Sequence, residues 1–281
     1  PLGIEAAVLR LDRLHPLISG NKWFKLQGYL AQAKAEGKSG LLTFGGAWSN
    51  HILATAAAGA ALGLRTAAVI RGEAPGMPSP TLLEAAALGM RLFYSSRAGY
   101  RQKAVPPEVW TELDPASTLL VPEGGYGAAG AAGAEGIAAS DGWARYTHVL
   151  ASVGTGTTLA GLLRASAPGQ QVIGISALKN NHSLEAAVRA LLPGTLHGRV
   201  DVRHEFHFGG YARHSPELIA FMNDWYRRTG VPSDFVYTGK LFFAADALAR
   251  AGHFAPGSRI LLLHSGGLQG NRSLPAGTLI F

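Results

Sequence analysis

The chain has 281 residues, of which 47% are hydrophobic and 15% are charged, so it can bury a large core and is not a disordered tail. The formal net charge is +7 at pH 7, but the basic residues are scattered singly, which argues against a nucleic-acid partner and favours a small anionic ligand. Because the chain contains no cysteine, disulfides, iron–sulfur clusters, thiolate zinc sites and cysteine nucleophiles are excluded.

Membrane and metal partners are not expected either. The longest apolar stretch, 52–64, is too short to span a bilayer, and no basic-apolar-small signal segment opens the chain. We therefore expect a cytoplasmic protein with no membrane partner. The sequence contains no His-Glu-x-x-His motif and no tight carboxylate cluster, so no metal site is predicted.

Short β-branched or leucine-rich runs alternate with helical patterns along almost the whole chain, which is typical of βαβ units and predicts an α/β fold with parallel sheets. The predicted strands are 7–11, 41–44, 66–70, 92–94, 118–121, 148–151, 171–176, 201–206 and 259–263. Helix ends are readable at Ser79–Pro80, at Ser183 ahead of 184–192, and at Ser215–Pro216 ahead of 217–228, which Gly230 closes.

The segment 124–136 consists mostly of glycine and alanine. Such a composition indicates either a flexible linker or close packing of one backbone segment against another. The composition alone leaves both interpretations open.

Two lysines stand where a turn at Ser19 and Gly20 runs into a helix. Lys22 or Lys25 near a helix N-terminus is disfavoured as a cation, and partial burial lowers the pKa of an amine further. Both effects suit an amine nucleophile. The alternative interpretation is a solvated surface lysine, and position alone does not separate the two.

A second polar segment follows the predicted strand 41–44. Its glycines let backbone N–H groups turn toward a ligand, and Ser49, Asn50 and His51 then open an apolar helix whose N–H groups suit a carboxylate or phosphate. Ser49 or Asn50 can also be a helix N-cap, and one residue can both cap and bind.

A third segment lies directly after the predicted strand 148–151. Two glycines and three threonine hydroxyls at a strand-to-helix junction predict a phosphate cradle built from Gly154, Thr155, Gly156, Thr157 and Thr158. No Gly-Lys-Ser/Thr ending follows, and the third glycine of a dinucleotide fingerprint is out of register. A nucleoside triphosphate ligand is therefore not expected.

Further polar groups lie toward the C-terminus, and each is ordinary when taken alone. They are Tyr211 after two glycines, the helix opening 236–240 with Tyr237 and Thr238, and Ser265 after the last predicted strand.

In chain order these segments resemble the pyridoxal-phosphate enzymes of the tryptophan synthase β type, within the branch of aminocyclopropane-carboxylate deaminase and D-cysteine desulfhydrase. The resemblance extends from 9–12 to 264–267 and is carried by 20–22, 49–50 and 236–240. It implies pyridoxal 5'-phosphate as cofactor, bound in a cleft between two α/β domains, each a mostly parallel sheet flanked by helices. The large domain is expected at 1–24 and 126–281, the small one at 25–125, and the assembly is expected to be a homodimer.

The resemblance also implies roles for the matching residues toward the cofactor. Lys22 binds it covalently, with Lys25 as the competing candidate, Asn50 hydrogen-bonds its phenolic oxygen, and Thr238 lies at its ring nitrogen. The glycine and threonine loop 154–158 holds its phosphate.

The same resemblance assigns the substrate contacts. The backbone of Ser49, Asn50 and His51 holds the substrate carboxylate, and Ser265 also contacts the substrate. The hydroxyl of Ser49 lies near the reacting carbon, while Tyr211 and Tyr237 serve the substrate amine and the proton transfers.

Thr238 and Ser265 are small hydroxyls where relatives that open the cyclopropane ring carry an acid and an apolar residue, which is the pattern of the D-cysteine desulfhydrase side. A carboxylate at the ring nitrogen keeps it protonated, whereas a hydroxyl does not force this. We therefore expect a lyase or hydrolase that performs β-elimination on D-cysteine or a β-substituted alanine, with Lys22 as base, releasing pyruvate, ammonia and sulfide.

Three alternatives stay open. The enzyme can open the ring of aminocyclopropane carboxylate, it can replace the β-substituent instead of eliminating it, or the chain can be an idle binding protein on the same fold. Trp23 and Phe24 between the lysines, and Gln27 where relatives carry an acid, depart from the family pattern and suggest a divergent subgroup.

Overall fold

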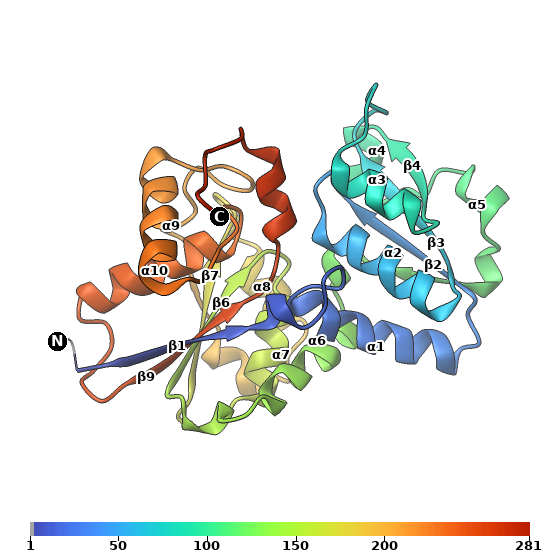
Figure 1. Cartoon of the computed structure of the whole chain (residues 1–281). Coiled ribbons are helices and arrows are strands. Elements are labelled where there is room, and N and C mark those ends of the chain that lie inside the picture. The colour runs from blue at the N-terminus through green and yellow to red at the C-terminus, as the bar shows by residue number, and fades with distance from the viewer. Residues whose placement is uncertain (1–2) are drawn as a thin grey trace.

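The computed structural model describes residues 3–281, which form two parallel β-sheets covered by helices (Figure 1). The five-stranded sheet has the order β1-β9-β6-β7-β8, and the four-stranded sheet has the order β4-β3-β2-β5. Every strand pairing in both sheets is parallel. The predicted α/β class with two mostly parallel sheets is confirmed.

The strands are β1 (Glu5–Arg10), β2 (Gly40–Gly45), β3 (Arg65–Arg71), β4 (Arg91–Ser95), β5 (Thr118–Val121), β6 (His148–Val153), β7 (Gln171–Ser176), β8 (Asp201–Arg203) and β9 (Arg259–His264). Each coincides with a predicted strand. The prediction 201–206 is too long, because only Asp201–Arg203 pair with β7. The prediction 7–11 starts late and ends one residue too far, since Leu11 already opens a 3-10 turn.

The α-helices are α1 (Asn21–Ala35), α2 (Asn50–Leu62), α3 (Pro80–Ala87), α4 (Arg97–Arg101), α5 (Val109–Glu112), α6 (Ala128–Glu135), α7 (Thr157–Ala165), α8 (Leu184–Arg189), α9 (Pro216–Thr229) and α10 (Thr238–Arg250). The predicted N-caps Ser79 and Ser215 accept hydrogen bonds from the backbone N–H groups of Leu82 and Leu218. Gly230 ends α9 in the left-handed conformation. The helix predicted at 184–192 is shorter and stops at Arg189.

Helices cover both faces of each sheet. In the five-stranded unit, apolar side chains of α6, α7 and α8 pack on one face and those of α9 and α10 on the other. In the four-stranded unit, α1, α2 and α3 pack on one side, and α4 and α5 on the other. Strands buried on both faces read as continuous apolar runs, which explains why the strands were recognisable in the sequence.

The glycine-rich segment 124–136 is a packing element and not a linker. Most of it forms α6, which lies against α1 and α7 (Figure 1). A Cβ on Gly28 of α1 would lie 1.9 Å from the carbonyl oxygen of Ala129, and one on Gly133 would lie 2.2 Å from that of Phe24. Only glycine permits this approach of two helix backbones, so the close-packing interpretation is correct.

The two sheets assign β2 to β5 to one unit and the other strands to the second. The domain bounds 24/25 and 125/126 stay a prediction, and the first of them falls inside α1. Across residues 3–281, no helix combines the length and apolar character that crossing a bilayer requires.

Candidate active site

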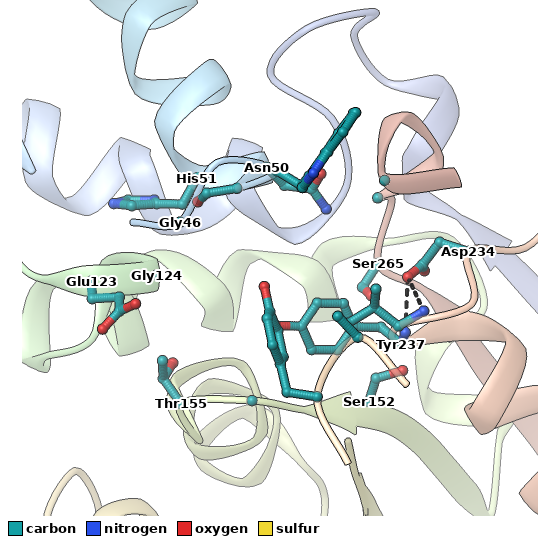
Figure 2. Close-up of a pocket in the computed structure, with 18 of the residues that line it drawn as sticks. Gly46, Asn50, His51, Glu123, Gly124, Ser152, Thr155, Asp234, Tyr237 and Ser265 are labelled. Atoms are coloured by element: carbon teal, nitrogen blue, oxygen red, sulfur yellow. Dashed lines mark hydrogen bonds between the residues drawn. The ribbon is translucent and has the colours of Figure 1, made fainter. Parts of the chain in front are cut away.

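A cavity of about 770 Å³ lies between the two units, at the carboxyl ends of their strands (Figure 2). Arg71 ends β3, Ser152 and Val153 end β6, and Ser265 follows β9; all of them line the cavity. Ligands of open parallel α/β sheets bind at this edge, because the loops there are free to vary while the strands hold them in place.

The cavity brings together almost all of the predicted site residues. Those that line it are Lys22, Ser49, Asn50, His51, Gly154, Thr155, Gly156, Thr158, Tyr211, Tyr237 and Ser265. Thr157 and Thr238 do not line it; both are fully buried behind the surface.

Lys22 and Lys25 lie one turn apart at the start of α1, and both face the cavity. The Nζ of Lys22 donates to Oδ1 of Asn21 at 2.7 Å, and that of Lys25 donates to the carbonyl of Gly124 at 3.0 Å. Burial lowers the pKa of Lys22 to about 8, against the opposing pull of the Asp234 carboxylate. Burial and the neighbouring Lys22 lower the pKa of Lys25 as well. An amine with a pKa near 8 is a usable nucleophile and base near neutral pH.

Ser49 caps α2, and its hydroxyl accepts from the backbone N–H of Ile52 at 3.3 Å. Its own backbone N–H donates to the carbonyl of Gly46 at 3.0 Å. This N–H is therefore already engaged within the loop, because a backbone donor has one proton to give, and its contact with a substrate carboxylate stays a prediction. The N–H groups of Asn50 and His51 keep the ability to make such a contact, since the first turn of a helix leaves its donors unpaired.

The ring of His51 is held in one tautomer. The hydroxyl of Thr43 donates to the carbonyl of Val121 at 2.8 Å, so its oxygen accepts from Nε2–H of His51 at 2.9 Å. The proton is thus on Nε2, and Nδ1 is a buried acceptor without a partner among the described residues. Burial and two nearby lysines lower the pKa of His51, which keeps the ring neutral.

The predicted phosphate cradle forms the turn between β6 and α7 (Figure 2). Gly156 has a φ of 88°, a conformation that favours glycine, and the first helical residue follows it. The hydroxyl of Thr158 accepts from Nδ2 of Asn21 at 2.8 Å, which ties the cradle to α1. Thr157 lies away from the cavity, with its hydroxyl 3.1 Å from that of Thr155.

Tyr211 and Tyr237 meet edge to face at the cavity wall, with ring centroids 6.1 Å apart. Burial raises the pKa of both phenols, so both keep their protons near pH 8. The loop that carries Tyr211 is held by Lys240 of α10, whose Nζ donates to the carbonyls of His207 and Gly210 at 2.8 and 2.7 Å. The position of Tyr211 at the cavity wall thus has a structural basis.

Asp234 was not predicted, yet it lines the cavity close to Ser265 (Figure 2). Its carboxylate accepts four hydrogen bonds at the start of α10: from the N–H groups of Val236, Tyr237 and Thr238, and from the Thr238 hydroxyl at 2.7 Å. Thr238 therefore turns toward Asp234 instead of the cavity. Asp234 stands directly ahead of the predicted helix opening 236–240, and this position could have identified it as a helix cap.

Other lining residues that the sequence analysis missed are charged, and several follow strand ends. They are Arg71, Arg97, Glu123 and Arg213. Arg71 and Glu123 stand at or just after the predicted strands 66–70 and 118–121, so the rule that sites form at carboxyl ends of parallel strands points to them. Within residues 3–281, no group of three or more His, Asp or Glu side chains is arranged to hold a metal ion.

Comparison with known proteins decides the family. The model of the family described as "Pyridoxal-phosphate dependent enzyme" matches residues 1–266. The chain belongs to the pyridoxal-phosphate-dependent enzyme family. This pyridoxal-phosphate enzyme is 30% identical to a putative 1-aminocyclopropane-1-carboxylate deaminase of Pyrococcus abyssi, over 96% of its own length and 86% of the relative's.

Two further relatives of the pyridoxal-phosphate enzyme support the same family assignment. It is 28% identical to a bifunctional D-cysteine desulfhydrase/1-aminocyclopropane-1-carboxylate deaminase of Arabidopsis thaliana, described as mitochondrial, over 96% of this chain and 74% of the relative. It superposes on the crystal structure of an ACC deaminase homologue with a TM-score of 0.78 and 27% identity, covering 96% of this chain and 86% of the other. The chain is thus a pyridoxal-phosphate-dependent enzyme with the family's fold.

The relatives correct the enzyme class expected from the sequence. These relatives are named as deaminases and desulfhydrases, so the enzyme class is lyase or deaminase, and hydrolase is wrong. In a β-elimination the bond to the leaving group breaks without water.

The residues present fit pyridoxal phosphate. Lys22 supplies an amine with a lowered pKa, and Lys22 and Lys25 form no ion pair with a carboxylate of residues 3–281, as an anionic ligand requires. Oδ1 of Asn50 is buried without a described partner, and the cradle 154–158 offers the N-terminus of α7.

Proposed function

We propose that this enzyme removes the β-substituent of a small amino acid and releases a keto acid and ammonia, as a D-cysteine desulfhydrase does. The observation that carries the proposal is the placement of the Lys22 amine, with its pKa near 8, in one cavity with the Tyr211–Tyr237 pair. A base and protonated phenols in one cavity suit the removal and return of protons at neighbouring carbons.

Each predicted residue has a task in this proposal. Lys22 would hold the cofactor, and its amine, with a pKa near 8, would take the proton from the substrate α-carbon. When bound, pyridoxal phosphate withdraws electrons from that carbon. The N–H groups of Asn50 and His51 hold the substrate carboxylate, and the phenols of Tyr211 and Tyr237 supply protons to the leaving group.

The alternative, ring opening of aminocyclopropane carboxylate, gains support from Asp234. The Thr238 hydroxyl donates to Asp234 and does not line the cavity, whereas Asp234 does. A carboxylate at the cavity wall favours a protonated ring, which is what ring opening requires. The hydroxyls of Thr238 and Ser265 therefore distinguish β-elimination from ring opening less sharply than the sequence pattern suggests.

Keto-acid release tests the choice. The cofactor-loaded enzyme is given D-cysteine, L-cysteine or aminocyclopropane carboxylate, and the product is identified as pyruvate or 2-oxobutyrate. Pyruvate from D-cysteine supports elimination. Formation of 2-oxobutyrate from the cyclopropane substrate favours the alternative, and a thioether product on addition of a second thiol identifies β-replacement.

The non-enzymatic alternative has its own test. The substitution Lys22→Ala removes the amine to which the cofactor is proposed to bond, so the absorbance of the bound cofactor shifts to that of the free aldehyde. An unchanged spectrum would exclude Lys22 as the bonding residue and revive the idle binding protein.

We propose in addition that residues 25–125 form the domain that closes over the substrate, that the enzyme is a homodimer, and that it works in the cytoplasm. A cavity lined by both sheet units supports the first of these. Chromatography coupled to light scattering measures the second, and cell fractionation measures the third.

A further inference from the structure

Three arginines line the mouth of the cavity and have no task in the proposed reaction. Arg71 ends β3, Arg97 opens α4, and Arg213 follows the loop that carries Tyr211. All three are exposed. They approach from opposite sides, since Arg71 and Arg97 belong to the four-stranded unit and Arg213 to the five-stranded unit.

These guanidinium groups have no anionic partner in the described chain. The arginine ion pairs found within residues 3–281 involve other arginines. The two carboxylates of the cavity are engaged elsewhere: Glu123 accepts from the Tyr100 hydroxyl at 2.7 Å and from Lys103, and Asp234 binds the start of α10. The mouth is therefore strongly cationic.

Arg71 lies close to the loop that opens α2. Its Nη2 is 3.5 Å from the position of a Cβ on Gly46, and its Cζ is 6.0 Å from the centre of the Tyr100 ring. Tyr100 is itself fixed by Glu123. A guanidinium beside a fixed ring loses less conformational freedom on binding a ligand.

We propose that the arginines of the mouth select a substrate whose side chain ends in an anion: a carboxylate, sulfonate or phosphate. A planar guanidinium matches these groups with paired hydrogen bonds. The cradle 154–158 is proposed to hold the cofactor phosphate, and the N–H groups of Asn50 and His51 the substrate carboxylate, so the arginines remain for a third anion.

This inference rests on the proposed function. In the elimination, the bond from the β-carbon to the side-chain group breaks, and that group leaves with the electron pair. One substrate and one water then give one pyruvate, one ammonia and the protonated leaving group, with no oxidant or reductant.

The test compares S-carboxymethylcysteine with S-carbamoylmethylcysteine, each as both enantiomers. The two differ only in a terminal carboxylate or amide, and both carry a thiolate leaving group. Keto-acid release gives kcat/KM, and titration calorimetry gives Kd where an enantiomer is not turned over. The proteins are the cofactor-loaded wild type, the double variant Arg71→Gln/Arg97→Gln, and the control Arg101→Gln, an exposed arginine of α4 that does not line the cavity.

We expect the wild type to prefer the carboxylate by about tenfold or more, as charge-assisted hydrogen bonds provide. The double variant should lose this preference while the amide changes by less than about twofold, and Arg101→Gln should change neither. Equal wild-type values for the two compounds would overturn the inference. So would an equal loss for both in the double variant, which would place Arg71 on the α-carboxylate that both compounds share.

The outcome separates the inference from the proposed function. If neither compound nor cysteine releases pyruvate, the elimination is wrong, and the ratio of the two Kd values still decides the role of the arginines. If the amide and cysteine react but the carboxylate is not preferred, the elimination stands and the inference fails.

Discussion

At the scale of single residues, the chemistry of this enzyme depends on side chains in the cavity whose pKa values or hydrogen bonds are set by their surroundings. Burial lowers the pKa of Lys22 to about 8 and keeps the His51 ring neutral, while the Asp234 carboxylate accepts four hydrogen bonds. Environments that push neighbouring groups apart in pKa are typical of acid–base sites. Residue identity alone does not reveal these states, because burial and partners come from distant segments.

The lowered pKa of Lys22 predicts the pH dependence of cofactor loading. Only the neutral amine reacts with the aldehyde of pyridoxal phosphate, so the loading rate of apoprotein should rise with pH up to about 8 and then level off. With an ordinary lysine, the loading rate would keep rising toward the usual lysine pKa of 10.5. Stopped-flow absorbance measures the rate, and a curve without a plateau below pH 9 would contradict the shift.

The pairing of His51 with Thr43 predicts a stability loss. The substitution Thr43→Val leaves Nε2–H of His51 buried without an acceptor and should lower the free energy of unfolding by about 1–3 kcal/mol. Thr66→Val is the matched control, because Thr66 is also buried on a neighbouring strand and its hydroxyl makes no hydrogen bond within the described chain. Urea titration measures both, and equal losses would argue against the His51–Thr43 bond.

At the scale of elements, the site depends on how closely α1 and α6 pack. Lys22 and Lys25 are placed by α1, which reaches the cavity because glycines let its backbone touch that of α6. Interiors of this density accept added volume poorly. The glycine- and alanine-rich segment 124–136 thus packs against the helix that carries Lys22 and keeps it in position.

Gly28→Ala tests this support. Its Cβ would lie 1.9 Å from the carbonyl oxygen of Ala129, so the helices must separate, at a cost of about 1–3 kcal/mol in the free energy of unfolding. Cofactor affinity should fall with it because the lysines move. Gly198→Ala is the control, with nothing within 4 Å of the added methyl group. Thermal melting and cofactor titration measure both variants, and a wild-type melting temperature for Gly28→Ala would refute the packing argument.

At the scale of the whole molecule, the cavity exists because two sheets turn their carboxyl ends toward each other (Figure 1). Arg272 and Glu84 join the two units by an ion pair: Arg272 follows β9, and Glu84 lies in α3. Both side chains are partly exposed, so the pair holds the units only weakly. A weak ion pair at this point is compatible with movement of the two units about the tightly packed α1 and α6.

A double-mutant cycle of Glu84→Gln and Arg272→Gln measures this contact. The coupling energy in unfolding should be at most about 1 kcal/mol and should vanish in 1 M salt. Arg272 lowers the pKa of Glu84 in the folded protein, so this stabilisation is present above the unfolded value of 4.5 and is lost as the pH falls below it. A coupling that persists in high salt or at pH 3 would contradict this account.

The sequence by itself determined the strands, the α/β class and the segments that form the site. Strands buried on both faces, glycine turns and helix caps are local patterns, so they can be recognised without knowing the fold. The resemblance carried by Lys22, Asn50 and Tyr237 then led to the cofactor. Thr157 and Thr238 belonged to the right segments, but their side chains face away from the cavity.

Only the tertiary structure decided which residues from distant parts of the chain come together around those segments. Arg71, Glu123 and Asp234 are far apart in the chain, and their place in the cavity follows from which strand ends adjoin. The engagement of the Ser49 N–H, the tautomer of His51 and the unpaired charge of Arg71 depend on atoms contributed by other elements. Hydrogen-bond partners and burial are properties of the assembled chain, and they determine which of its many polar residues are free to act.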